Sequence, residues 1–196
     1  MDLAVIALSF AAIFVVELPD KTFLATLVLS TRYSPLLVWI GVGLAFTVQT
    51  LIAVALGGVV GLLPDHWVQA GAMTLFLLGA VLLVRAARNE SDEDTDDYAA
   101  RAGDAHGWRV VGASFLVLFA AEWGDLSQLL ILSLVAKYGA PVSVFIGALG
   151  ALLTVSGLAA LAGRVLIRRV PIRVLHYAGA LICLALAGFT ALELFG

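Results

Sequence analysis

The chain has 196 residues, of which 62% are hydrophobic and 13% are charged. Soluble domains carry about 25% charged residues, so this composition excludes a soluble protein and indicates an integral membrane protein. The single cysteine, Cys183, excludes a disulfide framework within one chain and a cysteine-rich metal site. The formal net charge of −3 is informative only through the positions of the individual charges.

Six apolar segments are long enough to cross the roughly 30 Å hydrocarbon core of a bilayer as helices. Continuous apolar runs of this kind favour helices over a barrel of short alternating strands. The first run has no basic region before it and continues into acidic residues, so we expect a first span and not a signal peptide. The six predicted spans are residues 3–30, 35–63, 67–84, 110–136, 141–163 and 175–195.

The basic residues predict the orientation of these spans. Cytoplasmic loops are enriched in Lys and Arg, so the loops after the first, third and fifth spans are expected in the cytoplasm and both termini outside. Because no transit peptide is evident and Arg greatly exceeds Lys, the expected location of this multi-pass protein is a bacterial cytoplasmic (inner) membrane. The nine basic residues in these loops, of eleven in the chain, are Arg32, Arg85, Arg88, Arg101, Arg109, Arg164, Arg168, Arg169 and Arg173.

The two halves of the chain resemble each other. Residues 17–22, ELPDKT, align with residues 122–127, EWGDLS, at an offset of 105. Each half holds three spans, an odd number, so the second half enters the membrane from the opposite side. We therefore predict an all-α polytopic membrane protein of six transmembrane helices in two inverted-topology repeats, residues 1–85 and 110–196, joined by an acidic cytoplasmic linker, residues 86–109. This architecture is typical of secondary transporters, with the substrate site near the midplane.

Of the fourteen acidic residues, four lie neither in loops nor near the chain ends but inside apolar spans: Glu17, Asp20, Glu122 and Asp125. Each pair has i, i+3 spacing, which places both carboxylates on one helix face. An acid at the centre of a membrane helix costs several kcal/mol and is usually retained for an ion or proton pathway. Four acids at equivalent repeat positions therefore predict an ion site.

The residues around these acids predict the kind of ion. Pro19 and Gly124 favour local unwinding, which frees backbone carbonyl oxygens, while Thr22 and Ser127 add hydroxyl oxygens. A site made only of oxygen atoms suits Mg²⁺, Ca²⁺ or Mn²⁺. The predicted metal ligands are Glu17, Asp20, Thr22, Glu122, Asp125 and Ser127.

The same four acids are the predicted proton carriers. Four carboxylates in a low-dielectric site cannot all remain ionised without a cation, so protons should replace the metal when it leaves. The acids would then titrate as one coupled group. We interpret this pattern as a divalent cation:proton antiporter.

Several neighbouring polar residues are open to a structural or a functional interpretation. Lys21, whose repeat counterpart is Leu126, pairs with Glu17 or reaches the interface in the first interpretation, and offsets one carboxylate in the second. Polar residues of the second and fifth spans most simply form interhelical hydrogen bonds. The candidates for a supporting or gating role are Lys21, Gln49, Thr50, Gln128 and Ser156.

The two motifs resemble the twin Glu-x-Gly-Asp-(Lys/Arg)-(Ser/Thr) signatures of the calcium/manganese:proton exchangers, once catalogued as uncharacterised protein family 0016. That family includes Golgi, thylakoid and bacterial manganese exporters, and the resemblance covers nearly the whole chain. It implies export of Mn²⁺, or of Ca²⁺ in some members, from the cytoplasm in exchange for protons. Pro19 stands at the Gly position of the first copy and Leu126 at the basic position of the second, and neither change removes an oxygen ligand.

The resemblance also implies the partners. We expect the divalent ion, protons and the lipid bilayer, with no permanently bound cofactor and no nucleic acid, and the sequence defines no oligomeric state. Two other functions are weighed against antiport. An exporter of a small cationic solute, such as a basic amino acid, could use the same carboxylates. An intramembrane aspartyl protease would need only two acids sharing a proton, and so leaves the doubled motif unexplained.

Overall fold

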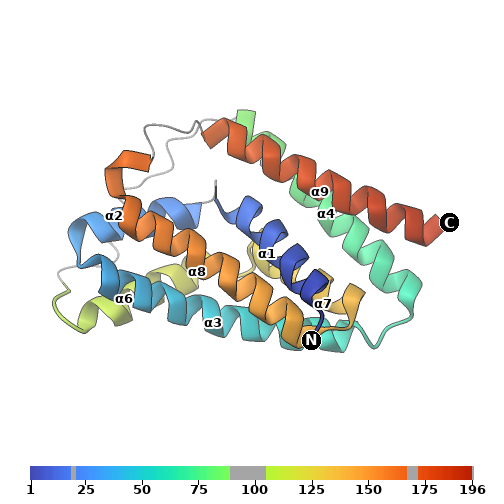
Figure 1. Cartoon of the computed structure of the whole chain (residues 1–196), viewed down its shortest axis with the longest axis horizontal. Helices are drawn as coiled ribbons and strands as arrows, with labels where there is room; N and C mark the ends of the chain where they lie inside the picture. The colour runs from blue at the N-terminus through green and yellow to red at the C-terminus, as the bar shows by residue number, and fades with distance from the viewer. Residues whose placement is uncertain (19–20, 89–104, 167–171, 196) are drawn as a thin grey trace.

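A computed structural model describes residues 1–18, 21–88, 105–166 and 172–195, and these form helices with no strand among them (Figure 1). The prediction of an all-α protein is therefore confirmed. The helices are α1 (Leu3–Glu17), α2 (Lys21–Arg32), α3 (Pro35–Val60), α4 (Asp65–Arg88), α6 (Arg109–Ala121), α7 (Leu126–Tyr138), α8 (Pro141–Leu166) and α9 (Ile172–Phe195).

Two helices of the described chain are each long and apolar enough to cross a membrane: α3, over Pro35–Val60, and the Pro141–Leu161 part of α8. A third span is formed if α6 and α7 are counted together, although their axes differ by 74°. Shorter apolar helical stretches occupy Leu3–Glu17, Gln69–Leu82 and Cys183–Leu192. These features are those of a membrane protein, with fewer continuous spans than the six expected.

Two of the expected spans, those that carry the acidic motifs, are each represented by two helices. The expected span at residues 3–30 consists of α1 and α2, and the one at 110–136 consists of α6 and α7. Long apolar runs lie on both sides of each short polar motif, so a search for apolar segments joins the two helices into one expected span. In the second span the separation has a local cause, because Gly124 adopts a φ of +77° that a continuing right-handed helix does not allow.

Local sequence signals explain where the other helices begin and end. Asp2 caps α1, with its carboxylate accepting a hydrogen bond from the Ala4 N–H at 2.9 Å. Pro35 and Pro141 begin α3 and α8, where the missing N–H is not needed. Gly139 ends α7 in the left-handed conformation, with a φ of +59°.

The central helices pack across the two halves of the chain: α1 lies against α8, and α3 lies against α6. At the α3–α6 crossing, a methyl group on Gly41 would clash with the Val111 carbonyl oxygen and lie 2.9 Å from Ser114 Cβ. At the α1–α8 crossing, a methyl group on Gly147 would clash with the Ile6 carbonyl oxygen, also 2.9 Å from a serine Cβ, that of Ser9. Glycine therefore allows both crossings to bring backbones into close contact.

The remaining long helices, α4 and α9, lie side by side along one flank of the bundle (Figure 1). They contact the central helices mainly through α7 and α1. Phe76 of α4 and Cys183 of α9 are fully buried in this layer. The central helices, and not this flank, carry the acidic motifs.

Candidate cation site

The site forms at the α6–α7 break, which comprises residues 122–125. Glu122 caps the end of α6, with its N–H donating to the Leu118 carbonyl at 3.0 Å. Trp123 and Gly124 turn the chain, and Asp125 is the N-cap of α7 in an extended conformation. The Asp125 side chain makes no capping hydrogen bond to α7, although aspartate is among the best residues for that purpose. Its carboxylate instead faces the other acids.

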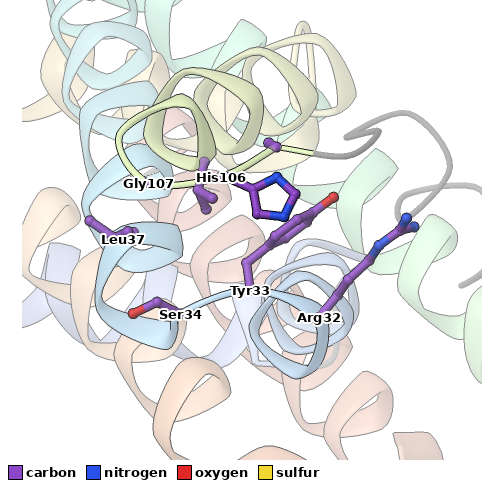
Figure 2. Close-up of a pocket in the computed structure, with 8 residues that line it drawn as sticks. Arg32, Tyr33, Ser34, Leu37, His106 and Gly107 are labelled. Atoms are coloured by element: carbon purple, nitrogen blue, oxygen red, sulfur yellow. The ribbon is translucent and has the colours of Figure 1, made fainter.

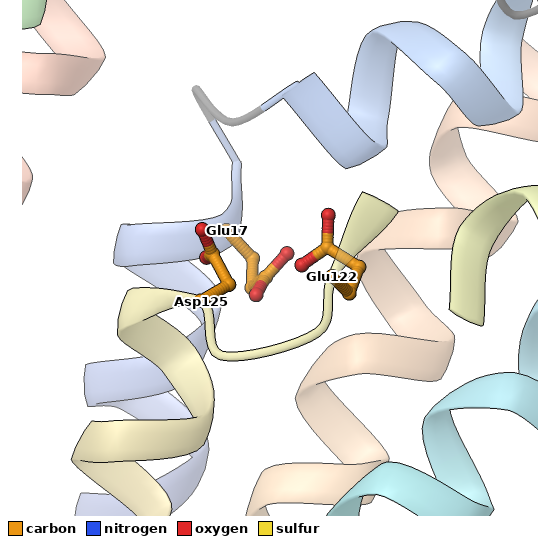
Figure 3. A group of neighbouring side chains, drawn as sticks. All are labelled: Glu17, Glu122 and Asp125. Carbon is orange, nitrogen blue, oxygen red and sulfur yellow. The ribbon is translucent and has the colours of Figure 1, made fainter. Parts of the chain in front are cut away.

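Three acids converge here, one from α1 and two from the α6–α7 break. Glu17, the last residue of α1, meets Glu122 and Asp125 so that one carboxylate oxygen from each lies within 4.8 Å of the others (Figure 3). Glu17 and Glu122 are each only 1% exposed, and Asp125 is partly buried. We call these three residues the acid cluster.

The spacing of the acid cluster suits one hard divalent cation. Two oxygen ligands of the same ion can be no farther apart than twice the metal–oxygen distance, about 4.6–5.2 Å for Ca²⁺ and about 4.0–4.2 Å for Mg²⁺. Carboxylate oxygens within 4.8 Å of one another meet this limit for the larger ion and need only a small contraction for the smaller one. One cation can therefore contact all three acids.

The charges in the acid cluster require compensation. Two unit charges 4.8 Å apart repel by about 3.5 kcal/mol at an effective dielectric constant of about 20, and three carboxylates give three such pairs. A divalent cation or bound protons can remove this repulsion. The arrangement is therefore suited to exchange one for the other.

A hydroxyl group from the first half of the chain reaches this cluster. Thr22 Oγ1, at the start of α2 and 3% exposed, donates a hydrogen bond to Glu122 Oε1. This contact links α2 to the end of α6, so the two motifs meet in space. Its equivalent in the second half, Ser127, is buried in the first turn of α7.

Replacing Thr22 tests this link. We expect Thr22→Val to weaken apparent metal affinity roughly tenfold, because a hydrogen bond to a charged group contributes about 1.5–3 kcal/mol. Thr22→Ser retains the hydroxyl and should bind metal as the unmodified protein does. Metal titration of purified protein measures both. Thr74→Val, which removes a hydroxyl bonded only to the Ala70 carbonyl of its own helix, is the control. Equal affinities for Thr22→Val and Thr74→Val would contradict the role of Thr22.

The other predicted site residues have different positions. Asp20 lies outside the described residues, and so does the side chain of Lys21, whose backbone begins α2. Thr50 and Ser156 are buried on α3 and α8, and the Ser156 hydroxyl donates to the Leu153 carbonyl of its own helix at 3.2 Å.

Two glutamines contact the backbone at the α6–α7 break. Gln49 Nε2 donates to the Phe119 carbonyl at 3.0 Å, and Gln128 Oε1 accepts from the Gly124 N–H at 3.0 Å. Both were expected near the motifs, but their backbone partners were not. A side chain that bonds to a main-chain group leaves no pattern in the sequence.

The serines at the helix crossings, Ser9 and Ser114, were not predicted as functional residues. Both are buried, and within the described part of the chain neither hydroxyl has a hydrogen-bond partner. They are separated by the same offset of 105 that relates the two acidic motifs. That shared offset could have identified the two serines as equivalent residues of the two halves.

A cavity of about 320 Å³ lies elsewhere, between the end of α2 and the start of α6 (Figure 2). Arg32 and Tyr33 both line this cavity, and the Arg32 guanidinium carbon lies 5.7 Å from the centre of the Tyr33 ring. None of the acid cluster lines this cavity, so it is separate from the candidate cation site. Its lining residues are Arg32, Tyr33, Ser34, Leu37, Ala105, His106, Gly107 and Val110.

Buried acids gathered where a broken membrane helix meets another helix are typical of secondary ion transporters. Comparison with known families agrees with this class. The model of the divalent cation/proton antiporter GDT1 family matches residues 5–91 and 110–196. The chain belongs to this family, so the predicted relationship is confirmed. The protein is therefore a member of a family of membrane cation/proton antiporters. The activity named for the family is transport.

Individual relatives support the assignment. The chain is 30% identical to the GDT1-like protein sll0615 of Synechocystis, over 78% of this chain and 82% of that protein. It is 29% identical to the chloroplastic GDT1-like protein 1 of Oryza sativa subsp. indica and to the chloroplastic protein PAM71 of Arabidopsis thaliana, over 96% of this chain in both cases. The chain spans only 62% and 56% of these two plant proteins. No solved structure matches the chain.

These relatives correct the predicted location. The rice and Arabidopsis proteins are named as chloroplastic, which overturns the expectation of a bacterial cytoplasmic membrane. The expectation was drawn from the excess of Arg over Lys and from the beginning of the chain. Arginine content reflects codon supply and not the membrane in which a protein resides.

Proposed function

We propose that this protein exports a divalent cation, Mn²⁺ in preference to Ca²⁺, in exchange for protons. The observation that carries the proposal is that Glu17 of α1 meets Glu122 and Asp125 of the α6–α7 break, with one carboxylate oxygen of each within 4.8 Å of the others. Oxygen ligands alone suit hard cations, and the absence of Cys and His from both motifs disfavours Zn²⁺ and Cu⁺. Either Mn²⁺ or protons can neutralise the acid cluster, so occupancy by one opposes occupancy by the other.

The proposal includes the remaining motif residues. Asp20 and Ser127 would complete the oxygen ligands supplied by the acid cluster and Thr22. All four motif acids would share the protons when the ion is released. No resident cofactor is needed, because the metal is the substrate.

The proposal also includes an inverted repeat of residues 1–85 and 110–196. Three observations support it: the family model matches each half, the motif spans are each divided into two helices, and the Ser9–Gly147 and Ser114–Gly41 crossings correspond at offsets of 105 and 106. A site between two such halves can be opened to either side by their relative movement.

Proton flux in proteoliposomes tests the proposed function. With the purified protein and a pH-sensitive dye inside the vesicles, an external Mn²⁺ pulse should drive proton release, Ca²⁺ should drive less, and Mg²⁺ least. Lysine and arginine pulses in parallel vesicles distinguish a metal antiporter from an exporter of cationic solutes. The absence of metal-driven flux at every imposed pH gradient, or a response to the amino acids instead, would overturn the proposal.

A further inference from the structure

The end of α6 leaves a backbone acceptor without its helical partner. In an uninterrupted helix the Phe119 carbonyl would accept from the N–H of Trp123. The side chain of Gln49, on α3, takes that place with a 3.0 Å hydrogen bond from Nε2. Gln49 is 3% exposed, so water does not compete strongly for this carbonyl. An amide from one helix therefore stabilises the point at which another helix stops.

The other side of the break has a matching contact. Gly124 adopts a φ of +77°, and its N–H donates to Gln128 Oε1 at 3.0 Å. An added methyl group at Gly124 would meet no atom within 4 Å, so backbone conformation and not crowding explains why glycine occupies this position. The two glutamines thus bond to the backbone on either side of Trp123. Glu122 and Asp125 flank the same short turn.

The residue types at the equivalent positions of the other repeat differ from those of this arrangement. The counterparts of Gln49 and Gln128, at offsets of 106 and 105, are Val155 and Phe23, which carry no hydrogen-bonding side chain. The counterpart of Gly124 is Pro19, which has no N–H and whose ring holds φ near −65°, so it cannot adopt the conformation of Gly124.

The two carbonyls at equivalent positions are also satisfied differently. The Phe14 carbonyl, which corresponds to that of Phe119, accepts from the Leu18 N–H at 3.1 Å as in an ordinary helix. The Phe119 carbonyl accepts from Gln49 across a helix contact. We call the bonds of Gln49 and Gln128 to the backbone of the α6–α7 break the amide clamp, and the equivalent positions, Val155 and Phe23, carry no side chain that could form such bonds.

We propose that Gln49 and Gln128 are positioning residues that hold the α6–α7 break in shape, so that Glu122 and Asp125 form a pre-ordered half of the cation site. Glu17 is then brought to this half by α1. Binding to ligands that are already ordered costs less conformational free energy than ordering them at the moment of binding. This inference rests on the proposed function for its transport readout, and it assigns the two halves of the site unequal roles.

Three substitutions and one control test the amide clamp. Gln49→Met and Gln128→Met have similar length but remove the donor and the acceptor, respectively. Gln128→Glu retains an oxygen that can accept from the Gly124 N–H. Thr47→Val, on the same helix as Gln49, removes a hydroxyl that donates only to the Gly43 carbonyl of that helix at 2.7 Å and serves as the control.

We expect both methionine variants to raise the KM for Mn²⁺ about tenfold while kcat changes less than about twofold, because the loss affects the ordering of the ligands. The KM of Gln128→Glu should lie within about threefold of that of the unmodified protein, and the KM of Thr47→Val should equal it. An unchanged KM in the methionine variants would overturn the proposal. Equal effects of Gln128→Glu and Gln128→Met, or of Gln49→Met and Thr47→Val, would do the same.

Hydrogen exchange separates this inference from the proposed function. In detergent without metal, backbone amides of residues 119–125 should exchange faster in Gln49→Met and Gln128→Met than in the unmodified protein and in Thr47→Val. This readout needs no transport. If the unmodified protein drives no metal-dependent proton flux, the proposed function fails while exchange still decides whether the clamp exists. Flux with unaltered exchange in the methionine variants would reject the clamp alone.

Discussion

Glu122→Gln should abolish metal-driven proton flux, with a decrease of roughly 100-fold or more, since even residues that only support metal ligands cost 10–100-fold in affinity when replaced. Glu122 is 1% exposed, lies within 4.8 Å of two further carboxylates through its oxygen atoms, and accepts the Thr22 hydroxyl. The amide has nearly the same shape as the carboxylate but neither its charge nor its capacity to take up a proton. Both the metal and the proton half of the exchange should therefore be lost.

Two further substitutions accompany Glu122→Gln: Glu17→Gln at another buried acid, and Asp2→Asn at an exposed acid as the matched control. Glu17→Gln should give the same loss, because Glu17 supplies the ligand from α1. Asp2→Asn makes the same change of carboxylate to amide at the exposed start of α1, where asparagine is an equally good helix cap, and should transport normally. Flux and Mn²⁺ binding are measured for all three in the same vesicles. Normal flux in Glu122→Gln would remove the acid cluster from the mechanism.

Gly41→Ala and Gly147→Ala should each destabilise the protein by about 1–3 kcal/mol, the usual cost of an added group in a well-packed interior. Each methyl group would clash with a backbone carbonyl oxygen of the helix it crosses and lie 2.9 Å from a serine Cβ. Neither a carbonyl nor a Cβ can move away without shifting its whole helix. Because the two crossings have the same geometry, we expect the two losses to be similar in size.

Thermal unfolding in detergent, followed by the loss of helical circular dichroism, measures this effect. Gly58→Ala, on the same helix as Gly41, introduces a methyl group with no atom within 4 Å and should be neutral or stabilising. Gly150→Ala, on the same helix as Gly147, meets only the Phe10 ring at 3.6 Å and should cost less than Gly147→Ala. Transition temperatures for Gly41→Ala and Gly147→Ala equal to those of these controls would show that the crossings are not tightly packed.

The sequence was sufficient to predict the helical class and the family, and it singled out the acids of the proposed ion site. Charges inside apolar spans are costly, so Glu17, Glu122 and Asp125 were conspicuous before their positions were known. The same Glu-x-x-Asp spacing occurs in both halves of the chain, which indicated that the two segments act together. The structure brings these three acids to one point, as a shared ion would require.

Other parts of the site could not be predicted, for physical reasons. Hydropathy does not detect a bend of 74° when the residues on both sides remain apolar, so α6 and α7 were expected as one continuous span. The hydrogen bond from Thr22 to Glu122 joins residues on different helices, which spacing along one helix cannot reveal. The bonds from Gln49 and to Gln128 involve backbone groups that are the same in every residue.

The packing of α1 on α8 and of α3 on α6 has a consequence for how the chain folds. During synthesis α1 is made first, but its partner α8 comes late in the second half, and α3 likewise waits for α6. Contacts between residues so distant along the chain form slowly, because a long loop must close before they are made. Until then Ser9 and Glu17 have none of their cross-half partners. Membrane insertion of the first half must therefore precede completion of the bundle, and the acid cluster can be assembled only after the α6–α7 break, which carries Glu122 and Asp125, has been synthesised.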